Sequence, residues 1–203
     1  MSFNSNVFIN CPFDKAYIPI LNALLFTFIY LKYTPLLSET TSSGDSRISG
    51  INSLISKSKY SLHDLSRMQS TKKNEISRFN MPFELGLDFG CKTYGSAEQK
   101  TKMLFILDKE KYRYQKAISD LSRNDIGSHG NNPEEAVREV RNWIRKIKAV
   151  QIDSANKIWN LYGEFTGDFR EEVDALEFNQ EDIDNMPKSE YCDFIESWLK
   201  SKM

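Results

Sequence analysis

The sequence predicts an α/β protein: a Rossmann-like (flavodoxin-like) parallel sheet with helices on both faces, followed by a helical C-terminal extension. Two observations predict it. Short apolar runs alternate with segments of helical periodicity in the first half of the chain, and the last quarter has a helical pattern. Strands that alternate with crossover helices pair in parallel and are covered on both faces. We expect the α/β domain to span residues 1–150, and residues 151–203 to pack on it or to serve assembly.

Four short apolar runs are the expected central strands. They are residues 6–10, 33–37, 60–63 and 103–107. Apolar residues at helical spacing follow the first two runs, in residues 18–31 and 48–55. A third crossover helix is expected around Phe83 to Phe89, with Gly90 as its stop.

After the fourth strand the alternation ends. Residues 112–122 are expected to form a helix, and residues 123–132 a polar loop that holds Gly127, His129 and Gly130.

A further helix is expected to begin at Pro133 and to run to about Val150. Asn132 is a typical capping residue, proline favours the first helical position, and Glu134 and Glu135 supply acids to the first turn. The rest of the chain is expected to be helical in pieces, with breaks at Gly163, Gly167 and Pro187.

Composition and charge exclude several classes of protein. The formal net charge is -1 and the pI about 6.2, so nucleic-acid binding is not indicated except through a partner. Cys11, Cys91 and Cys192 are far apart, which argues against a disulfide frame or a metal site and for a reducing, cytoplasmic location. Residues 18–31 are shorter than the roughly 20 apolar residues of a membrane span. No charged leader precedes an apolar core at the start, so we expect no secretory signal and no membrane association.

Glu84 is the main candidate for catalysis. The run from Arg78 to Leu87 places this single carboxylate in the expected first turn of a helix that follows a strand. In open α/β sheets, ligands bind beyond the carboxyl ends of the strands and at helix N-termini. The helix dipole would also favour its ionised form. Acids are common in first turns for that reason alone, so a structural role stays open.

Asp64 is the second candidate carboxylate. It closes the third strand, where it could reach ribose hydroxyls or orient a substrate, or could simply form an Asx-type turn. His63 alternates with Asp64 and is expected to be a structural histidine on the opposite face. His129 could serve acid-base chemistry, but the sequence shows no partner for it.

Residues Val7 to Asp108 resemble the nucleoside 2-deoxyribosyltransferases and the TIR-type NAD-cleaving domains. The resemblance rests on three short motifs: residues 7–13, residues 58–66, and Phe83-Glu84-Leu85-Gly86 followed by Gly90-Cys91-Lys92. It implies that Glu84 attacks the anomeric carbon or serves cleavage of the nicotinamide-ribose bond. The chain is also similar to small bacterial anti-phage effectors of this kind, which implies activation by homo-oligomerisation or by a protein partner. The helices after Val150 are then the candidate contact surface.

One departure from the family pattern bears on the ligand. The transferases usually carry an Asp shortly before the catalytic Glu to hold the base, whereas this chain has Ser77-Arg78-Phe79-Asn80. Arg78 instead suggests a phosphate or carboxylate on the ligand. A nucleotide or dinucleotide therefore fits better than a bare nucleoside.

The other expected substrate contacts lie in the loops beside these strands and at the start of the third helix. They are Asn10, Pro12, Phe13, Arg47, Asn80 and Met81. No Walker or dinucleotide glycine fingerprint is present.

We therefore expect an N-glycosidase or nucleoside deoxyribosyltransferase-like enzyme, with NAD hydrolysis as the first choice of reaction. NAD or a related nucleotide would be the substrate, and no separate cofactor or metal is expected. The alternative is a non-catalytic nucleotide-sensing or TIR-like adaptor module. A Glu84 that lines an open pocket with Asp64 and Asn10 would favour the enzyme, and a buried, salt-bridged Glu84 the binding module.

Overall fold

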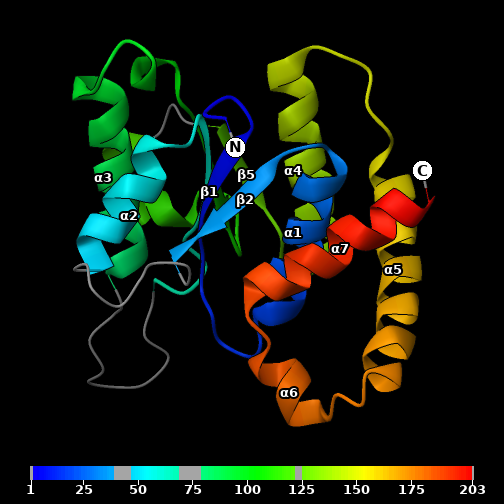
Figure 1. The fold of residues 1–203 in the computed structure, drawn as a ribbon. Coiled ribbons are helices and arrows are strands. Elements are labelled where there is room, and N and C mark those ends of the chain that lie inside the picture. The colour runs from blue at the N-terminus through cyan, green and yellow to red at the C-terminus, as the bar shows by residue number, and fades with distance from the viewer. Residues whose placement is uncertain (1, 39–46, 69–78, 122–124, 203) are drawn as a thin grey trace.

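The computed structural model describes residues 2–38, 47–68, 79–121 and 125–202. These residues form a five-stranded sheet in the order β2-β1-β3-β4-β5, and all four pairings are parallel (Figure 1). The strands are β1 (Asn6–Asn10), β2 (Thr34–Leu37), β3 (Tyr60–Asp64), β4 (Met103–Asp108) and β5 (Asp125–Ser128). The predicted parallel α/β sheet is thus confirmed.

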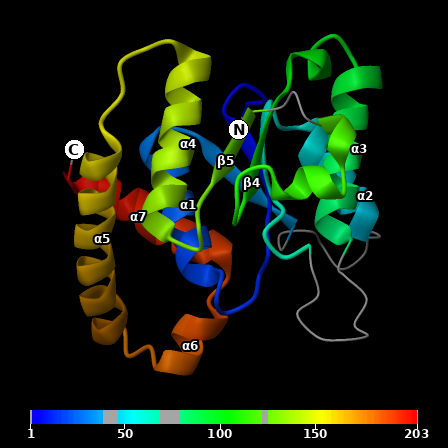
Figure 2. The same cartoon turned by 180° about the vertical axis from the view of Figure 1, so that it is seen from behind.

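Helices cover both faces of the sheet. Helices α1 (Ile18–Tyr30) and α4 (Pro133–Lys148) lie on one face, and α2 (Arg47–Ser56) and α3 (Asn80–Tyr94) on the other (Figures 1 and 2). Because α1 and α3 follow the neighbouring strands β1 and β3 on opposite faces, the chain diverges at the carboxyl ends of these two strands. Such a switch point is where open α/β sheets bind ligands.

The C-terminal extension packs on α1 and α4 rather than on the sheet. It consists of α5 (Ala155–Ala175), α6 (Gln180–Asn185) and α7 (Lys188–Lys202). Phe26 of α1 is fully buried, and its ring centroid lies 5.5 Å from that of Phe165 in α5 and 6.0 Å from that of Trp198 in α7. Helix α1 is apolar on nearly all sides because it lies between the sheet and this outer layer.

The sequence did not predict strand β5; it predicted a polar loop at these residues. It has only four residues, and Ile126 is its single large apolar side chain. A Cβ atom on Gly127 would lie 2.8 Å from the Phe105 ring and 2.8 Å from the Glu139 carboxylate. Close packing between β4 and α4 therefore requires the glycine that looked like a loop signal.

Three predicted glycine breaks are wrong. Helix α3 continues through Gly90, and α5 continues through Gly163 and Gly167. A glycine inside a helix costs only about 1 kcal/mol relative to alanine, and burial of apolar neighbours such as Phe165 offsets that cost. The predicted break at Pro187 is confirmed, since it separates α6 from α7.

The helix predicted over residues 112–122 is also not formed as such. The described part of that segment contains two short 3₁₀ turns, Arg113–Lys116 and Ser119–Leu121. Tyr112 adopts a left-handed conformation with φ 65°, which interrupts a regular helix before it begins.

None of the helices in the described ranges has the length and apolar character that a membrane span requires.

Candidate functional site

A cavity of about 590 Å³ opens at the switch point, beyond the carboxyl end of β1. Its volume lies in the range of small-molecule sites, roughly 300–1,000 Å³. The β1–α1 loop, the segment after β3, and the first residues of α2 and α3 form its walls. Most of the predicted site residues line it: Asn10, Pro12, Phe13, Arg47, Asn80, Met81 and Glu84.

Glu84 lies one turn further into α3 than the sequence suggested. The helix begins at Asn80, and its first turn contains no acidic residue. The helix dipole therefore does not favour the Glu84 anion as predicted. Instead, burial of the side chain raises the pKa of Glu84, and the charge of Arg47 only partly opposes this rise. Glu84 as a whole is 6% exposed, so it is largely removed from water at the wall of the cavity.

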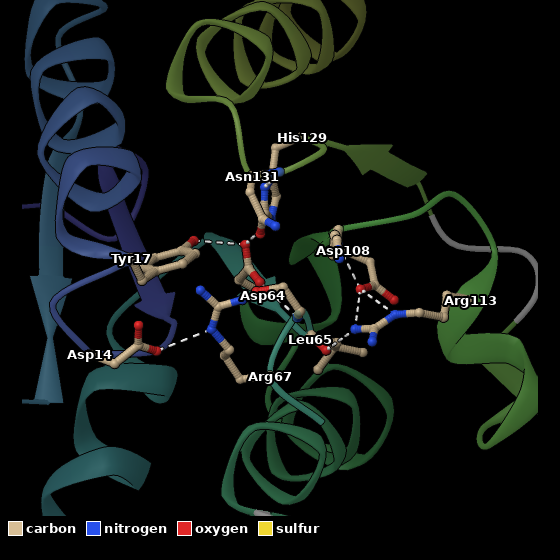
Figure 3. A network of polar contacts seen from close by, with 11 residues as sticks. Asp14, Tyr17, Asp64, Leu65, Arg67, Asp108, Arg113, His129 and Asn131 are labelled. Carbon is tan, nitrogen blue, oxygen red and sulfur yellow. Dashed lines mark hydrogen bonds and ion pairs between the residues drawn. The ribbon is translucent and has the colours of Figure 1, made fainter. Parts of the chain in front are cut away.

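Two arginines supply positive charge to the cavity. Arg47 is the first residue of α2, and Arg67 follows β3. Arg67 Nε lies 3.1 Å from Asp14 Oδ2, and both side chains are partly exposed (Figure 3). Arg67 was not singled out in the sequence, although its place just beyond the end of a strand was a usable signal. Arg78, the other predicted phosphate contact, lies outside the described residues.

Asn10 is held rigidly at the base of the cavity. Its amide nitrogen Nδ2 donates to the Met81 carbonyl oxygen at 2.9 Å and contacts His63 Nδ1 at 3.0 Å. Because a carbonyl oxygen accepts only, the nitrogen assignment of the amide is fixed, and His63 Nδ1 must be the unprotonated acceptor. Asn10 thereby joins the end of β1 to the first turn of α3.

A buried polar chain continues from His63 through Asp88 of α3 to Lys102, just before β4. His63 Nε2 lies 2.9 Å from Asp88 Oδ2, and Lys102 Nζ lies 3.1 Å from Asp88 Oδ1. Burial alone would raise the pKa of Asp88, but the hydrogen bond from His63 and the charge of Lys102 bring the net pKa below its usual value. His63 is fully buried with partners on both ring nitrogens, as expected for a structural histidine.

Asp64 does not line the cavity that contains Glu84. It is fully buried, and its Oδ2 accepts a hydrogen bond of 2.7 Å from the Tyr17 hydroxyl (Figure 3). Its Oδ1 accepts the Ser66 backbone N–H at 2.8 Å, which is the Asx-type turn weighed as the alternative. Burial and then the Asp64 charge raise the pKa of Tyr17, so the phenol stays protonated and donates.

His129 has the partner that the sequence could not show. Its Nε2 lies 3.1 Å from Asp64 Oδ2, but the angle between the two groups is not that of a hydrogen bond. Its Nδ1 accepts a hydrogen bond from the Asn131 backbone N–H at 3.0 Å (Figure 3). Tyr17, Asp64 and His129 thus connect the loops after β1, β3 and β5. The arrangement holds these loops together and is shielded from solvent.

An apolar groove adjoins the cavity on the α2–α3 side. It has a volume of about 190 Å³ and shares Arg47, Asn80 and Glu84 with the cavity. Its other walls are apolar: Ile48, Ile51, Phe83 and Leu87. Glu84 therefore stands between a polar compartment with two arginines and a small apolar one.

No cluster of three or more His, Cys, Asp and Glu side chains in the described residues is arranged to hold a metal ion.

Comparison with protein-family models, curated proteins and solved structures finds no match. The fold and the site define an α/β protein with flavodoxin-like strand order, a switch-point cavity and a packed helical extension.

Proposed function

We propose that this protein cleaves the N-glycosidic bond of a nucleotide-type ligand, with Glu84 as nucleophile or as stabiliser of the oxocarbenium-like transition state. NAD hydrolysis is the first choice of reaction, and transfer of the glycosyl group to another acceptor is the variant. A defence or toxin effector that acts in an assembly fits this chemistry. The observation that carries the proposal is the position of Glu84 between the polar cavity and the apolar groove.

An N-glycosidic bond joins two chemically different parts. On one side is a polar, often phosphorylated sugar, and on the other a flat base with apolar faces. Arg47 and Arg67 suit the phosphate, because guanidinium groups pair with phosphate oxygens in bidentate geometry. The groove beside Phe83 is smaller than a whole-ligand pocket and suits a single flat ring system. A ligand that spans both compartments places the bond between them next to Glu84.

The reaction needs negative charge beside the anomeric carbon. As the bond breaks, its electron pair leaves with the base nitrogen and the sugar carbon becomes positive. A carboxylate with little water around it stabilises that charge more strongly than a hydrated one. An oxygen of Glu84 can then bond to the carbon, and water subsequently displaces it to release the free sugar. The raised pKa of Glu84 reflects the same desolvation.

A nucleotide-sensing module without turnover is the second candidate. The burial of Asp64 favours it, because the predicted second catalytic carboxylate is not at the cavity with Glu84. Incubation of the purified protein with NAD, NADP, nucleotides and deoxynucleosides separates the two. Released free base supports the enzyme. Saturable binding of a nucleotide without release would support the sensing module.

A further inference from the structure

We infer that Asn10 accepts a hydrogen bond from the sugar hydroxyl next to the scissile carbon, so that the ligand is a ribosyl rather than a 2′-deoxyribosyl nucleotide. The inference rests on the proposed function and specifies its substrate class. It starts from a primary amide that lines the cavity while its nitrogen is fully used inside the protein.

A primary amide carries two hydrogens on nitrogen and two lone pairs on oxygen. One Asn10 hydrogen is directed to the Met81 carbonyl and the other to His63 Nδ1. The oxygen Oδ1 is therefore the atom that Asn10 can offer a ligand. An acceptor of this kind selects a donor such as a hydroxyl group.

The surrounding contacts prevent the Asn10 amide from rotating by about 180°, which would exchange its oxygen and nitrogen. A flip would place Oδ1 against the Met81 carbonyl oxygen, where two acceptors repel. It would also require a proton on His63 Nδ1 in addition to the one that Nε2 presents to Asp88. The chain through Asp88 to the buried Lys102 thus fixes which end of the amide faces the cavity.

Asn10 and Glu84 line the same cavity, and Met81 relates their positions. Met81, which holds Asn10, precedes Glu84 by three residues on α3, a rise of about 4.5 Å along the helix. A sugar bound in this cavity can therefore lie against both side chains. With Glu84 at the anomeric carbon, the adjacent ring carbon carries a hydroxyl in a ribosyl ligand and only hydrogen in a deoxyribosyl one.

This contact would act on rate as well as on binding. Hydrogen bonds to the hydroxyl beside the anomeric carbon strengthen in transition states of glycoside cleavage. A deoxy ligand would leave the Asn10 oxygen without a partner at a largely buried position, and sites built for a hydroxyl discriminate strongly against analogues that lack it.

The test compares the four ribonucleoside 5′-monophosphates, each with its 2′-deoxy counterpart, by calorimetry and by release of free base. The wild-type protein should prefer the ribosyl member of the best-bound pair by about tenfold or more. Asn10→Ala should bring this ratio close to one. Asn6→Ala is the matched control: Asn6 begins the same strand, is also 4% exposed, and its amide donates to the Lys57 carbonyl at 2.8 Å, away from the cavity.

The outcomes separate the inference from the proposed function. Glu84-dependent base release without ribosyl preference would overturn the inference and leave the function intact. Asn10-dependent ribosyl preference in binding, without base release, would support the inference and count against catalysis. Equal binding of both sugars, or no binding of either, would overturn the inference. If Asn10→Ala does not fold, the wild-type protein still tests the inference, because a wild-type ratio close to one would overturn it.

Discussion

At the scale of single residues, the chemistry of the site depends on how its charges are solvated. Glu84 is buried and its pKa is raised, while Arg47 opposes the rise. The ionised carboxylate is the form that stabilises a positive anomeric carbon. Activity should therefore fall as the pH drops through the pKa of Glu84, at a higher pH than for an ordinary glutamate.

Arg47→Met tests this electrostatic relation. Loss of the opposing charge should raise the pKa of Glu84 further, so the acid limb of the pH profile of kcat/KM should move to higher pH. Lys15→Met removes a well-exposed cation outside the cavity and should leave the limb in place. An acid limb that stays unchanged in Arg47→Met would contradict the assignment of that limb to Glu84.

The sequence identified many of the residues that line the cavity because loops at the carboxyl edge of a parallel sheet converge. Asn10, Arg47 and Glu84 follow from that rule and from residue type. The burial of Asp64 did not follow, because it depends on Tyr17 and His129, which are distant along the chain. Burial by residues far apart in sequence leaves no local signal.

At the scale of elements, Lys102 joins α2, α3 and the start of β4. Its ammonium group bonds to the carbonyl oxygens of Ile55 and Ser58 at the end of α2, and it pairs with Asp88 of α3. A positive charge at a helix C-terminus is favourable, and here it also compensates a buried carboxylate. This pairing fixes the two helices that form the apolar groove.

Lys102→Met should lower the free energy of unfolding by about 3–5 kcal/mol, because it leaves Asp88 buried with fewer partners. Thermal or urea unfolding measures this loss, and Lys100→Met, an exposed neighbour, should change stability by less than about 0.5 kcal/mol. Equal stability of the two variants would show that the buried pair contributes little.

The same variant has a pH signature. The folded pKa of Asp88 is depressed, so its stabilising contribution is present above the pKa of an unfolded Asp and is lost as the pH falls through the folded value. Removing the Lys102 charge should weaken that depression. Acid unfolding of Lys102→Met should then begin at a higher pH than that of the wild-type protein, in a circular dichroism titration.

Strands and helices differed in how well the sequence specified them. The four apolar strands were predicted because burial on both faces demands continuous apolar runs. Strand β5 has one large apolar residue and takes its conformation from pairing with β4. The glycines of α3 and α5 remain helical because the residues around them pack in the helix. Tertiary contacts therefore determine the conformation of β5 and the continuity of α3 and α5 through their glycines.

At the scale of the whole molecule, the extension and the α/β layer share one hydrophobic core. Residues of α5 and α7 belong to the same buried cluster as α1 and α4. A fragment of residues 1–150 would expose the face of α1 that carries Phe26. It should lose cooperative unfolding and bind an apolar dye, whereas the full chain should unfold in one transition. A fragment with a sharp thermal transition would show that the extension is dispensable for folding.

The central claim is that the Glu84 carboxylate acts on an N-glycosidic bond, and the most direct measurement is base release by Glu84→Gln. The amide keeps the size and loses the charge, so the fold should survive while turnover falls by about a hundredfold or more. Glu139→Gln is the matched control, because burial also raises the pKa of Glu139, which lies on α4 away from the cavity. It should keep wild-type turnover. A folded Glu84→Gln variant that releases base at the wild-type rate would contradict the account.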